Sequence, residues 1–190
     1  EESRQEQRRE QIQQIPLAEL HPFTNHPFKV LDDESMQRTV ESVEQYGVLS
    51  PLIARPRPEG GYEIISGHRR QRAAQLAGLE TLPVIVRNMD DNAAVLLMVD
   101  SNLQRENILP SERAFAYKMK LEALKNQGAR SDLTSSQIGT KLRADEKVAL
   151  DSGESRSQIQ RFIRLTNLIP ELLDMVDEKK IAFNPAVELS

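Results

Sequence analysis

One stretch decides the fold: residues 64–74 read IISGHRRQRAA. The run that ends there is strand-like over residues 62–65, and a helix-like run begins at His68, directly after Ser66 and Gly67. A strand that passes into a helix through Ser-Gly leaves backbone N–H groups unpaired at the helix start, where the helix dipole favours an anion. The junction therefore predicts a phosphate-binding site.

Three arginines follow the junction closely. We expect Arg69, Arg70 and Arg72 to crowd the start of the helix, because planar guanidinium groups match phosphate oxygens. The alternative is a solvated surface helix that carries arginines, since a short motif specifies a function only loosely.

Composition limits the class of protein. The 190-residue chain has room for two domains of modest size, and its 38% hydrophobic and 28% charged residues are typical of a soluble, helix-rich protein. The absence of cysteine excludes disulfides, thiolate metal sites and cysteine chemistry, and fits a reducing cytoplasm. No apolar run approaches membrane-spanning length, and we expect neither a signal peptide nor a membrane partner. With a net charge of −4, any DNA binding has to come from a local basic face.

The residue pattern divides the chain into three parts. Residues 1–14 are nearly all charged or Gln and are expected to form a polar arm. Residues 15–108 alternate strand-like and helix-like runs, which predicts a small mixed α/β domain. No strand signal remains from Pro110 onward, so residues 109–190 are predicted to be all-α. The fold class is therefore α+β, and we expect the chain to be a fragment, because it begins without Met and stops inside an apolar-patterned run.

Local signals place the elements of the α/β domain. Asp32 or Asp33 is expected to cap a helix that ends at Gly47. The predicted strands cover residues 15–20, 51–55, 62–65 and 82–87, and the predicted further helices cover residues 68–77 and 91–102.

Two capping boxes stand out in the helical part, one at residues 134–137 (TSSQ) and one at residues 155–158 (SRSQ). The helix after the second box has a polar arc of about 140° with three arginines and no acid, opposite an apolar side. Two short capped helices, the second with a basic outer face, predict a helix-turn-helix over about residues 134–165. The alternative is an ordinary amphipathic helix in an all-α bundle. The connection at residues 143–154 is longer than the usual turn, although it has room for an additional helical turn.

Several boxes together resemble the ParB family of DNA-partition proteins. Residues 67–73 (GHRRQRA) are similar to the family's G-E-R-R-x-R-A box. Residues 101–105 (SNLQR), followed by 109–112 (LPSE), are similar to its E-N-x-Q-R box and P-x-E-x-A helix start. The helix from Ser155 resembles its recognition helix, and the similarity runs in the family's order from about residue 15 to residue 189.

The resemblance implies a ParB/sulfiredoxin-like N-terminal domain that binds CTP, optionally with Mg²⁺, followed by a helix-turn-helix domain that binds a specific double-stranded DNA site. It further implies a CTP-dependent, clamp-like homodimer, a ParA-like ATPase as partner, and a cytoplasmic place on a nucleoid or plasmid. Carried over by position, the nucleotide-binding residues are Ser66, Gly67, His68, Arg69, Arg70, Asn102, Gln104 and Arg105. The DNA-binding residues are Thr134, Ser135, Gln137, Ser155, Arg156, Ser157, Gln160, Arg161 and Arg164.

Two departures from the family's pattern keep alternatives open. His68 and Ser101 stand where CTP-hydrolysing members carry carboxylates, so Mg²⁺ and an attacking water lose ligands. The chain is thus at most a weak CTPase, and no catalytic residue or metal ligand is assigned. A box of Q-P-R type is represented only by residues 24–27 (TNHP), which lack the arginine. The alternatives are a ParB-like transcriptional regulator with a degenerate nucleotide site, or a kinase or nuclease on the same fold.

Overall fold

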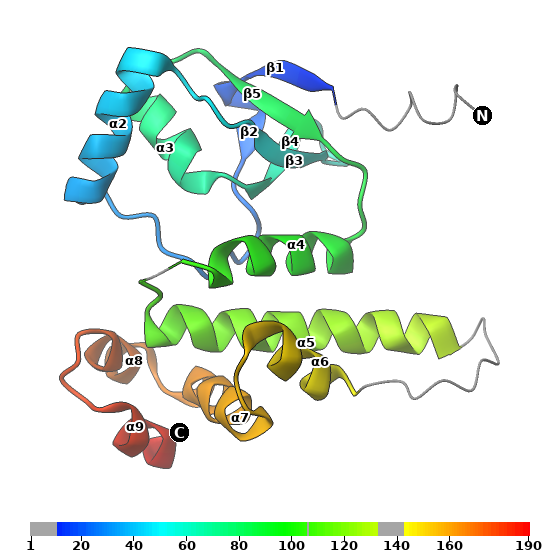
Figure 1. Cartoon of the computed structure of the whole chain (residues 1–190), viewed down its shortest axis with the longest axis vertical. Coiled ribbons are helices and arrows are strands. Elements are labelled where there is room, and N and C mark those ends of the chain that lie inside the picture. The colour runs from blue at the N-terminus through cyan, green and yellow to red at the C-terminus, as the bar shows by residue number, and fades with distance from the viewer. Residues whose placement is uncertain (1–10, 106, 133–142) are drawn as a thin grey trace. The chain divides into compact units, whose positions relative to one another are not determined.

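The computed structural model describes residues 11–105, 107–132 and 143–190, and of residues 129–132 only the backbone (Figure 1). The chain divides into two compact units, Glu1–Asp90 and Asp91–Ser190, and each is described by itself. The division falls earlier than the predicted boundary near residue 108, because α4 (Asp91–Leu103) packs along α5 (Pro110–Asp132) in the helical unit. Within the described residues, no helix combines the length and the apolar character that crossing a bilayer requires.

The first unit is built on a five-stranded mixed sheet. In sheet order its strands are β1 (Ile12–Pro16), β5 (Thr81–Val86), β3 (Leu52–Pro56), β4 (Tyr62–Ser66) and β2 (Leu20–His21). The central strand β3 runs parallel to β5 and antiparallel to β4. At the edges, β1 is antiparallel to β5 and β2 is parallel to β4.

The N-terminal edge of the sheet differs from the prediction. Residues 12–14, expected in the polar arm, belong to β1 and pair with β5, with Ile12 opposite Ile85. The polar composition was misleading because an edge strand leaves most of its side chains in solvent, and of β1 only Ile15 is buried. The predicted strand over residues 15–20 is also interrupted by a 3₁₀ turn, η1 (Leu17–Glu19).

Two helices accompany the sheet, α2 (Glu34–Tyr46) and α3 (His68–Leu76), and they pack against each other. As predicted, Asp33 caps α2 by accepting a hydrogen bond from Met36 N at 2.8 Å, and Gly47 ends it with a positive φ of 70°. Their apolar sides share one core with the sheet. Its buried members are Ile15, Leu20, Met36, Val43, Leu52, Ala54, Ile64, Ala73, Ala74, Leu82 and Val84.

The second unit is all-α in its described residues, as predicted. After α4 and α5 it contains α6 (Ala144–Ser152), α7 (Arg156–Arg164), the 3₁₀ turn η2 (Leu165–Asn167), α8 (Pro170–Asp177) and α9 (Phe183–Leu189). The long helix α5 packs against α4, α6, α7 and α8. Its buried core includes Tyr117, Leu121, Val148, Ile159 and Phe162.

Candidate functional site

The strand–helix junction forms as predicted. β4 ends at Ser66, α3 begins at His68, and Gly67 between them adopts a left-handed conformation with φ 110° and ψ 20°. A Cβ at this position would lie 2.7 Å from Leu52 Cγ and 3.3 Å from Arg70 Nη2. Both the backbone angle and the close packing therefore require glycine. The backbone of α3 closes its first hydrogen bond from Gln71 N to Gly67 O at 2.9 Å, so the positive end of the helix lies at the junction.

Of the three arginines that follow, only Arg70 lies against Gly67. Its Nη1 donates to the carbonyl oxygens of Ser50 at 2.5 Å and Pro51 at 2.8 Å, and burial lowers the pKa of its guanidinium. This arginine is therefore held next to the helix start by backbone acceptors from the segment that precedes β3.

The other two arginines turn away to the start of α2. Arg69 Nη2 donates to Ser35 Oγ at 3.1 Å. Arg72 forms a bidentate ion pair with Asp32, in which Nε lies 3.0 Å from Oδ1. The prediction that all three crowd the helix start was wrong. Neighbouring helix positions point about 100° apart, so consecutive arginines fan out around the axis and each finds its own acceptor.

His68 is buried and anchors the loop that contains Phe23. Its Nε2 accepts a hydrogen bond from Phe23 N at 3.3 Å, and its ring lies 3.8 Å from the ring of His26, centroid to centroid. The same loop is held by Glu63, whose Oε1 accepts from the backbone N of Thr24 at 3.1 Å. The loop that carries the TNHP segment is therefore fixed to β4 and α3 from two sides.

The second predicted nucleotide-binding box lies in the helical unit. Asn102 is buried, and its Nδ2 donates to Met98 O at 2.7 Å, while Arg105 N donates to Asn102 O at 3.1 Å at the end of α4. Gln104 is exposed. Because the box and the Gly67 junction belong to different units, their assembly into one nucleotide site stays a prediction.

Helices α6 and α7 form a compact pair joined by a short turn. Three residues separate them: Gly153 in a left-handed conformation with φ 69°, then Glu154, then Ser155, which caps α7 by accepting a hydrogen bond from Gln158 N at 3.1 Å. A turn of this length with a glycine is typical of a helix-turn-helix. Residues 143–154, which are longer than the usual turn, contain α6, so the additional helical turn for which the sequence left room is a helix of its own.

This pairing changes which helix precedes the recognition helix. α6 takes the place that the prediction gave to the helix after the first capping box. Thr134, Ser135 and Gln137 lie outside the described residues, so their predicted DNA contacts stay untested.

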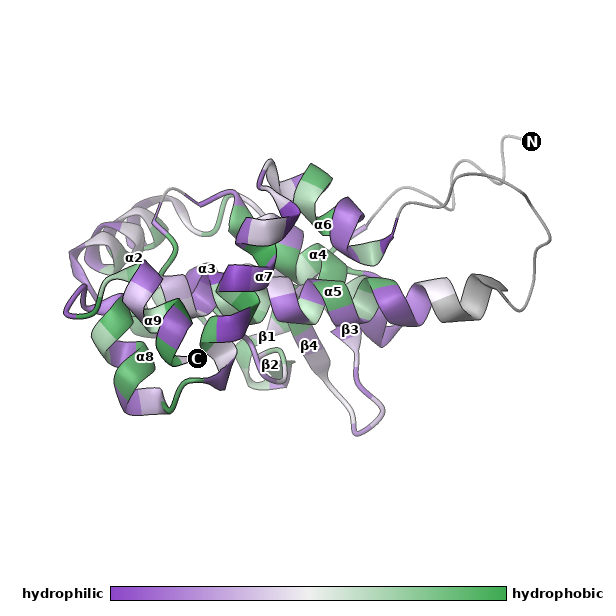
Figure 2. Ribbon diagram, turned by 90° about the horizontal axis from the view of Figure 1, so that it is seen from below, coloured by the Kyte–Doolittle hydropathy of each residue, from purple (hydrophilic) through white to green (hydrophobic). Residues whose placement is uncertain are grey.

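The polar arc of α7 is confirmed. Ile159 and Phe162 are buried against the core, and Phe162 meets Tyr117 on α5 with ring centroids 5.8 Å apart. Ser155, Arg156, Ser157, Gln160 and Arg164 are exposed and Arg161 is half-buried. Figure 2 shows both strongly hydrophilic (purple) and strongly hydrophobic (green) residues along α7.

The arginines of α7 are bound to neighbouring helices. Arg156, the first residue of α7, pairs with two acids in the first turn of α6: its Nε lies 3.0 Å from Asp145 Oδ2 and its Nη1 lies 3.4 Å from Glu146 Oε1. The Arg156 pair joins the two helices of the motif. At the other end of α7, Arg161 and Arg164 donate to acceptors on and after α9, namely Asn184 Oδ1 and Ser190 O. Within the described part of the chain, the side chains of Ser157 and Gln160 make no hydrogen bond, which leaves them available to a ligand.

Comparison with known proteins identifies the fold. Residues 1–103 match the family model of the ParB N-terminal domain. The chain belongs to this ParB family.

Curated relatives agree with this assignment. Over 170 residues the chain is 34% identical to the chromosome-partitioning protein Spo0J of Thermus thermophilus, covering 90% of this chain and 56% of the relative. Over 169 residues it is 37% identical to the stage 0 sporulation protein J of Bacillus subtilis, covering 89% of this chain and 54% of the relative. The chain thus spans little more than half the length of these ParB-type relatives.

Solved ParB structures share the fold. The C-terminally truncated ParB of Caulobacter crescentus, complexed to the centromeric parS site, superposes with a TM-score of 0.58 at 29% identity, covering 92% of this chain and 82% of that chain. A Pnob8-like ParB-N domain gives a TM-score of 0.61 at 18% identity, covering 93% of this chain and 78% of that chain, and supports the fold alone. The resemblance predicted from the sequence boxes and the α+β ParB fold are both confirmed.

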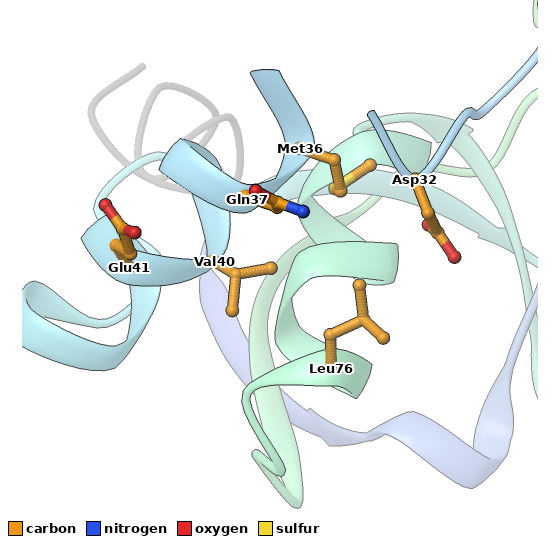
Figure 3. A pocket seen from close by; sticks show the side chains of 6 residues that line it. All are labelled: Asp32, Met36, Gln37, Val40, Glu41 and Leu76. Carbon is orange, nitrogen blue, oxygen red and sulfur yellow. The ribbon is translucent and has the colours of Figure 1, made fainter. Parts of the chain in front are cut away.

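The ParB unit with the Gly67 junction also has a cavity of about 390 Å³ between α2 and α3 (Figure 3). The residues that line it are Asp32, Met36, Gln37, Val40, Glu41 and Leu76. Val40 and Leu76 extend from the two helices toward the space between them. None of the lining residues is Arg or Lys and two are acids, so this cavity does not suit a polyphosphate.

Three ionic contacts of this ParB-family chain were missed from the sequence. Glu63 pairs with Arg55 on β3 at 2.7 Å, Asp145 and Glu146 hold Arg156, and the buried Lys120 joins two acids. The Glu63–Arg55 pair has a weak sequence signal, because charges that face each other across a hairpin tend to pair. Lys120 has none that local pattern could show, because its partners lie on other helices.

Proposed function

We propose that this ParB-family chain is a site-specific DNA-binding protein of chromosome, plasmid or mobile-element partition, and that its α/β unit binds CTP. The observation that carries the proposal is the α6–α7 pair. It has a three-residue turn, a capped second helix and an exposed polar arc, and it occurs in a chain similar to a ParB solved on a parS site.

The proposed DNA contacts follow from the geometry of α7. In a helix-turn-helix the N-terminal part of the second helix lies in the major groove. There Ser157 and Gln160 are exposed and have no hydrogen-bond partner within the described chain, so both can meet base edges. Glutamine pairs best with adenine N6 and N7. We expect Arg164, exposed on the same arc, to bind a phosphate.

The proposed CTP contacts begin at the Gly67 junction. Two features present there fit a polyphosphate: the helix start is electropositive, and Arg70 lies beside it. Asn102, Gln104 and Arg105 complete the proposed site by family resemblance. Among the described residues, no group of three or more His, Cys, Asp or Glu side chains could hold a metal, so Mg²⁺ would have to be bound mainly through the phosphates.

The wider ParB activities are proposals by family resemblance. CTP binding pairs two copies of the chain into a clamp, a ParA-like ATPase is the partner, and the protein works on a nucleoid or plasmid. A plain ParB-like regulator is the second candidate function. It is favoured by one observation, that protein atoms already bind all three guanidinium groups of α3.

Calorimetric titration with the four ribonucleoside triphosphates separates the two candidates. The proposal predicts that CTP binds in preference to the others and that Arg70→Ala weakens CTP binding by about tenfold or more, because a charged hydrogen bond is lost. Arg72→Ala is the matched control and keeps CTP affinity, since Arg72 is bound to Asp32. Absence of CTP binding, with site-specific DNA binding retained, favours the plain regulator.

A further inference from the structure

Lys120 is a buried cation in the helical unit. It lies in the middle of α5 with 2% of its surface exposed. Its Nζ is 2.7 Å from Asp100 Oδ1 on α4 and 2.9 Å from Asp151 Oδ2 on α6. One ammonium group therefore joins three helices, and α4 and α5 lie side by side in Figure 1.

The two acids differ from Lys120 in exposure. Their side chains are 51% exposed for Asp100 and 39% exposed for Asp151, against 3% for Lys120. They border a polar cavity of about 400 Å³ that Gln104 also lines. Burial acts to lower the pKa of Lys120, but its hydrogen bonds to both acids outweigh burial and raise the pKa, so the ammonium form is retained.

The two acids that contact Lys120 lie next to two predicted binding elements. Asp100 directly precedes the SNLQR box at the end of α4. Asp151 is in the last turn of α6, two residues before the Gly153 turn that leads into α7. One cation is thus shared between the box and the first helix of the DNA-binding pair. Because both carboxylates bind the same ammonium group, displacement of one changes the electrostatic interaction of Lys120 with the other.

We propose that Lys120 is a positioning residue that couples the SNLQR box on α4 to the helix-turn-helix, by holding Asp100 and Asp151 at the same ammonium group. This inference rests on the proposed function, since it requires that the box contacts CTP and that α6–α7 contacts DNA. A ligand at the box that shifts the end of α4 moves Asp100, which alters the contact of Lys120 with α6 and the placement of α7.

Lys120→Met is the decisive variant, with Lys125→Met on the exposed side of the same helix as its matched control. Methionine is only one atom shorter than lysine, and removing one partner of an ion pair is costly chiefly where it leaves a buried charge. The freed acids are partly exposed and remain hydrated. Asp100→Asn, which removes the negative charge on the α4 side of the contact, is the second variant and is expected to fold in any case.

The measurement is the affinity for the specific DNA duplex with and without CTP. In the unmodified chain CTP is expected to change this affinity by about fivefold or more, the usual range for coupled sites. Lys120→Met and Asp100→Asn are expected to bring the ratio close to one, while Lys125→Met keeps it. An unchanged ratio in both variants overturns the inference, as does a ratio of one in the unmodified chain when CTP and DNA each bind.

A failure of the proposed function is distinguishable, because the unmodified chain then fails to bind CTP, the specific duplex or both. Amide hydrogen exchange tests the contact in that event without any ligand. Lys120→Met is expected to raise exchange in α4 and α6 relative to Lys125→Met, and equal exchange in the two variants overturns the inference.

Discussion

Two helices of this chain, α3 and α7, carry three arginines each and use them differently. On α3 the arginines occupy positions 69, 70 and 72, and they separate toward Ser50, Pro51 and the start of α2. On α7 they occupy positions 156, 161 and 164, which return to one side of the helix within an arc of about 140°. Positions 69, 70 and 72 also span only about 160° of the α3 wheel, so the acceptors around each helix, more than helical spacing, decide where its arginines lie.

The two regions also differ in how they use glycine. Gly67 precedes α3 in a position where a Cβ would meet Leu52 and Arg70, whereas Gly153 precedes α7 in open space. The α3 junction is therefore constrained by packing and the α6–α7 turn by backbone conformation alone. Because the α3 junction is tightly packed, substitution of its glycine is expected to have the largest effect on stability.

Gly67→Ala is expected to destabilise the chain by about 2–4 kcal/mol, because a left-handed alanine is strained and its Cβ overpacks against Leu52. Gly153→Ala, which meets no atom within 4 Å, is expected to lose only about 1–2 kcal/mol. Chemical denaturation of the two variants measures the difference. Equal losses of stability in the two variants would show that packing against Leu52 adds nothing to the cost of replacing Gly67.

Gln160→Ala on α7 is expected to weaken specific DNA binding by about 1–3 kcal/mol, because a glutamine that pairs with a base edge is lost. Gln75→Ala on the exposed side of α3 is the matched control and keeps the affinity. Fluorescence anisotropy with the specific duplex measures both. A similar loss of DNA affinity in the two variants would show that α7 does not lie in the groove.

Arg164→Ala is expected to weaken binding to all DNA sequences alike and to reduce the slope of affinity against salt by about one counterion, because a phosphate contact is lost. Arg72→Ala on α3 should leave both unchanged, since Arg72 is paired with Asp32. Titrations over a range of salt concentrations test the pair. An effect confined to one base pair would instead make Arg164 a base contact.

The pair between Arg156 and Asp145 is expected to contribute about 0.2–1 kcal/mol to stability, as partly exposed pairs do. A double-mutant cycle with Arg156→Ala and Asp145→Asn measures it. Burial works to raise the pKa of Asp145, but the hydrogen bond and charge of Arg156 lower it overall. The pair therefore stabilises the fold above the ordinary aspartate pKa of about 3.9 and is lost as pH falls through the lowered value. A coupling that persisted below that pH would contradict this ionic origin.

What the sequence predicted correctly is local in origin. The start of α3 at His68 and the cap of α7 at Ser155 depend on neighbouring residues, and both form as expected. The polar arc of α7 follows from helical spacing alone, which is why it too was predictable.

The features that the sequence did not predict depend on contacts with residues far along the chain. His68 is bound by Phe23, and Lys120 by acids on two other helices. α6 was expected only as an additional helical turn, because its N-cap is Arg143, which no capping rule favours; Glu146 Oε2 accepts from Arg143 N there. Tertiary contacts, which local pattern does not encode, also separated the three arginines of α3.

The proposed function depends most on α6 and α7 reading a DNA sequence. The most direct measurement selects a duplex from a random library with the chain, then compares its affinity with that of a scrambled duplex at the same physiological salt concentration. The selected duplex is expected to bind tighter by a factor of about 10³ or more, as is usual for specific DNA-binding proteins. A ratio near one would contradict the proposed function.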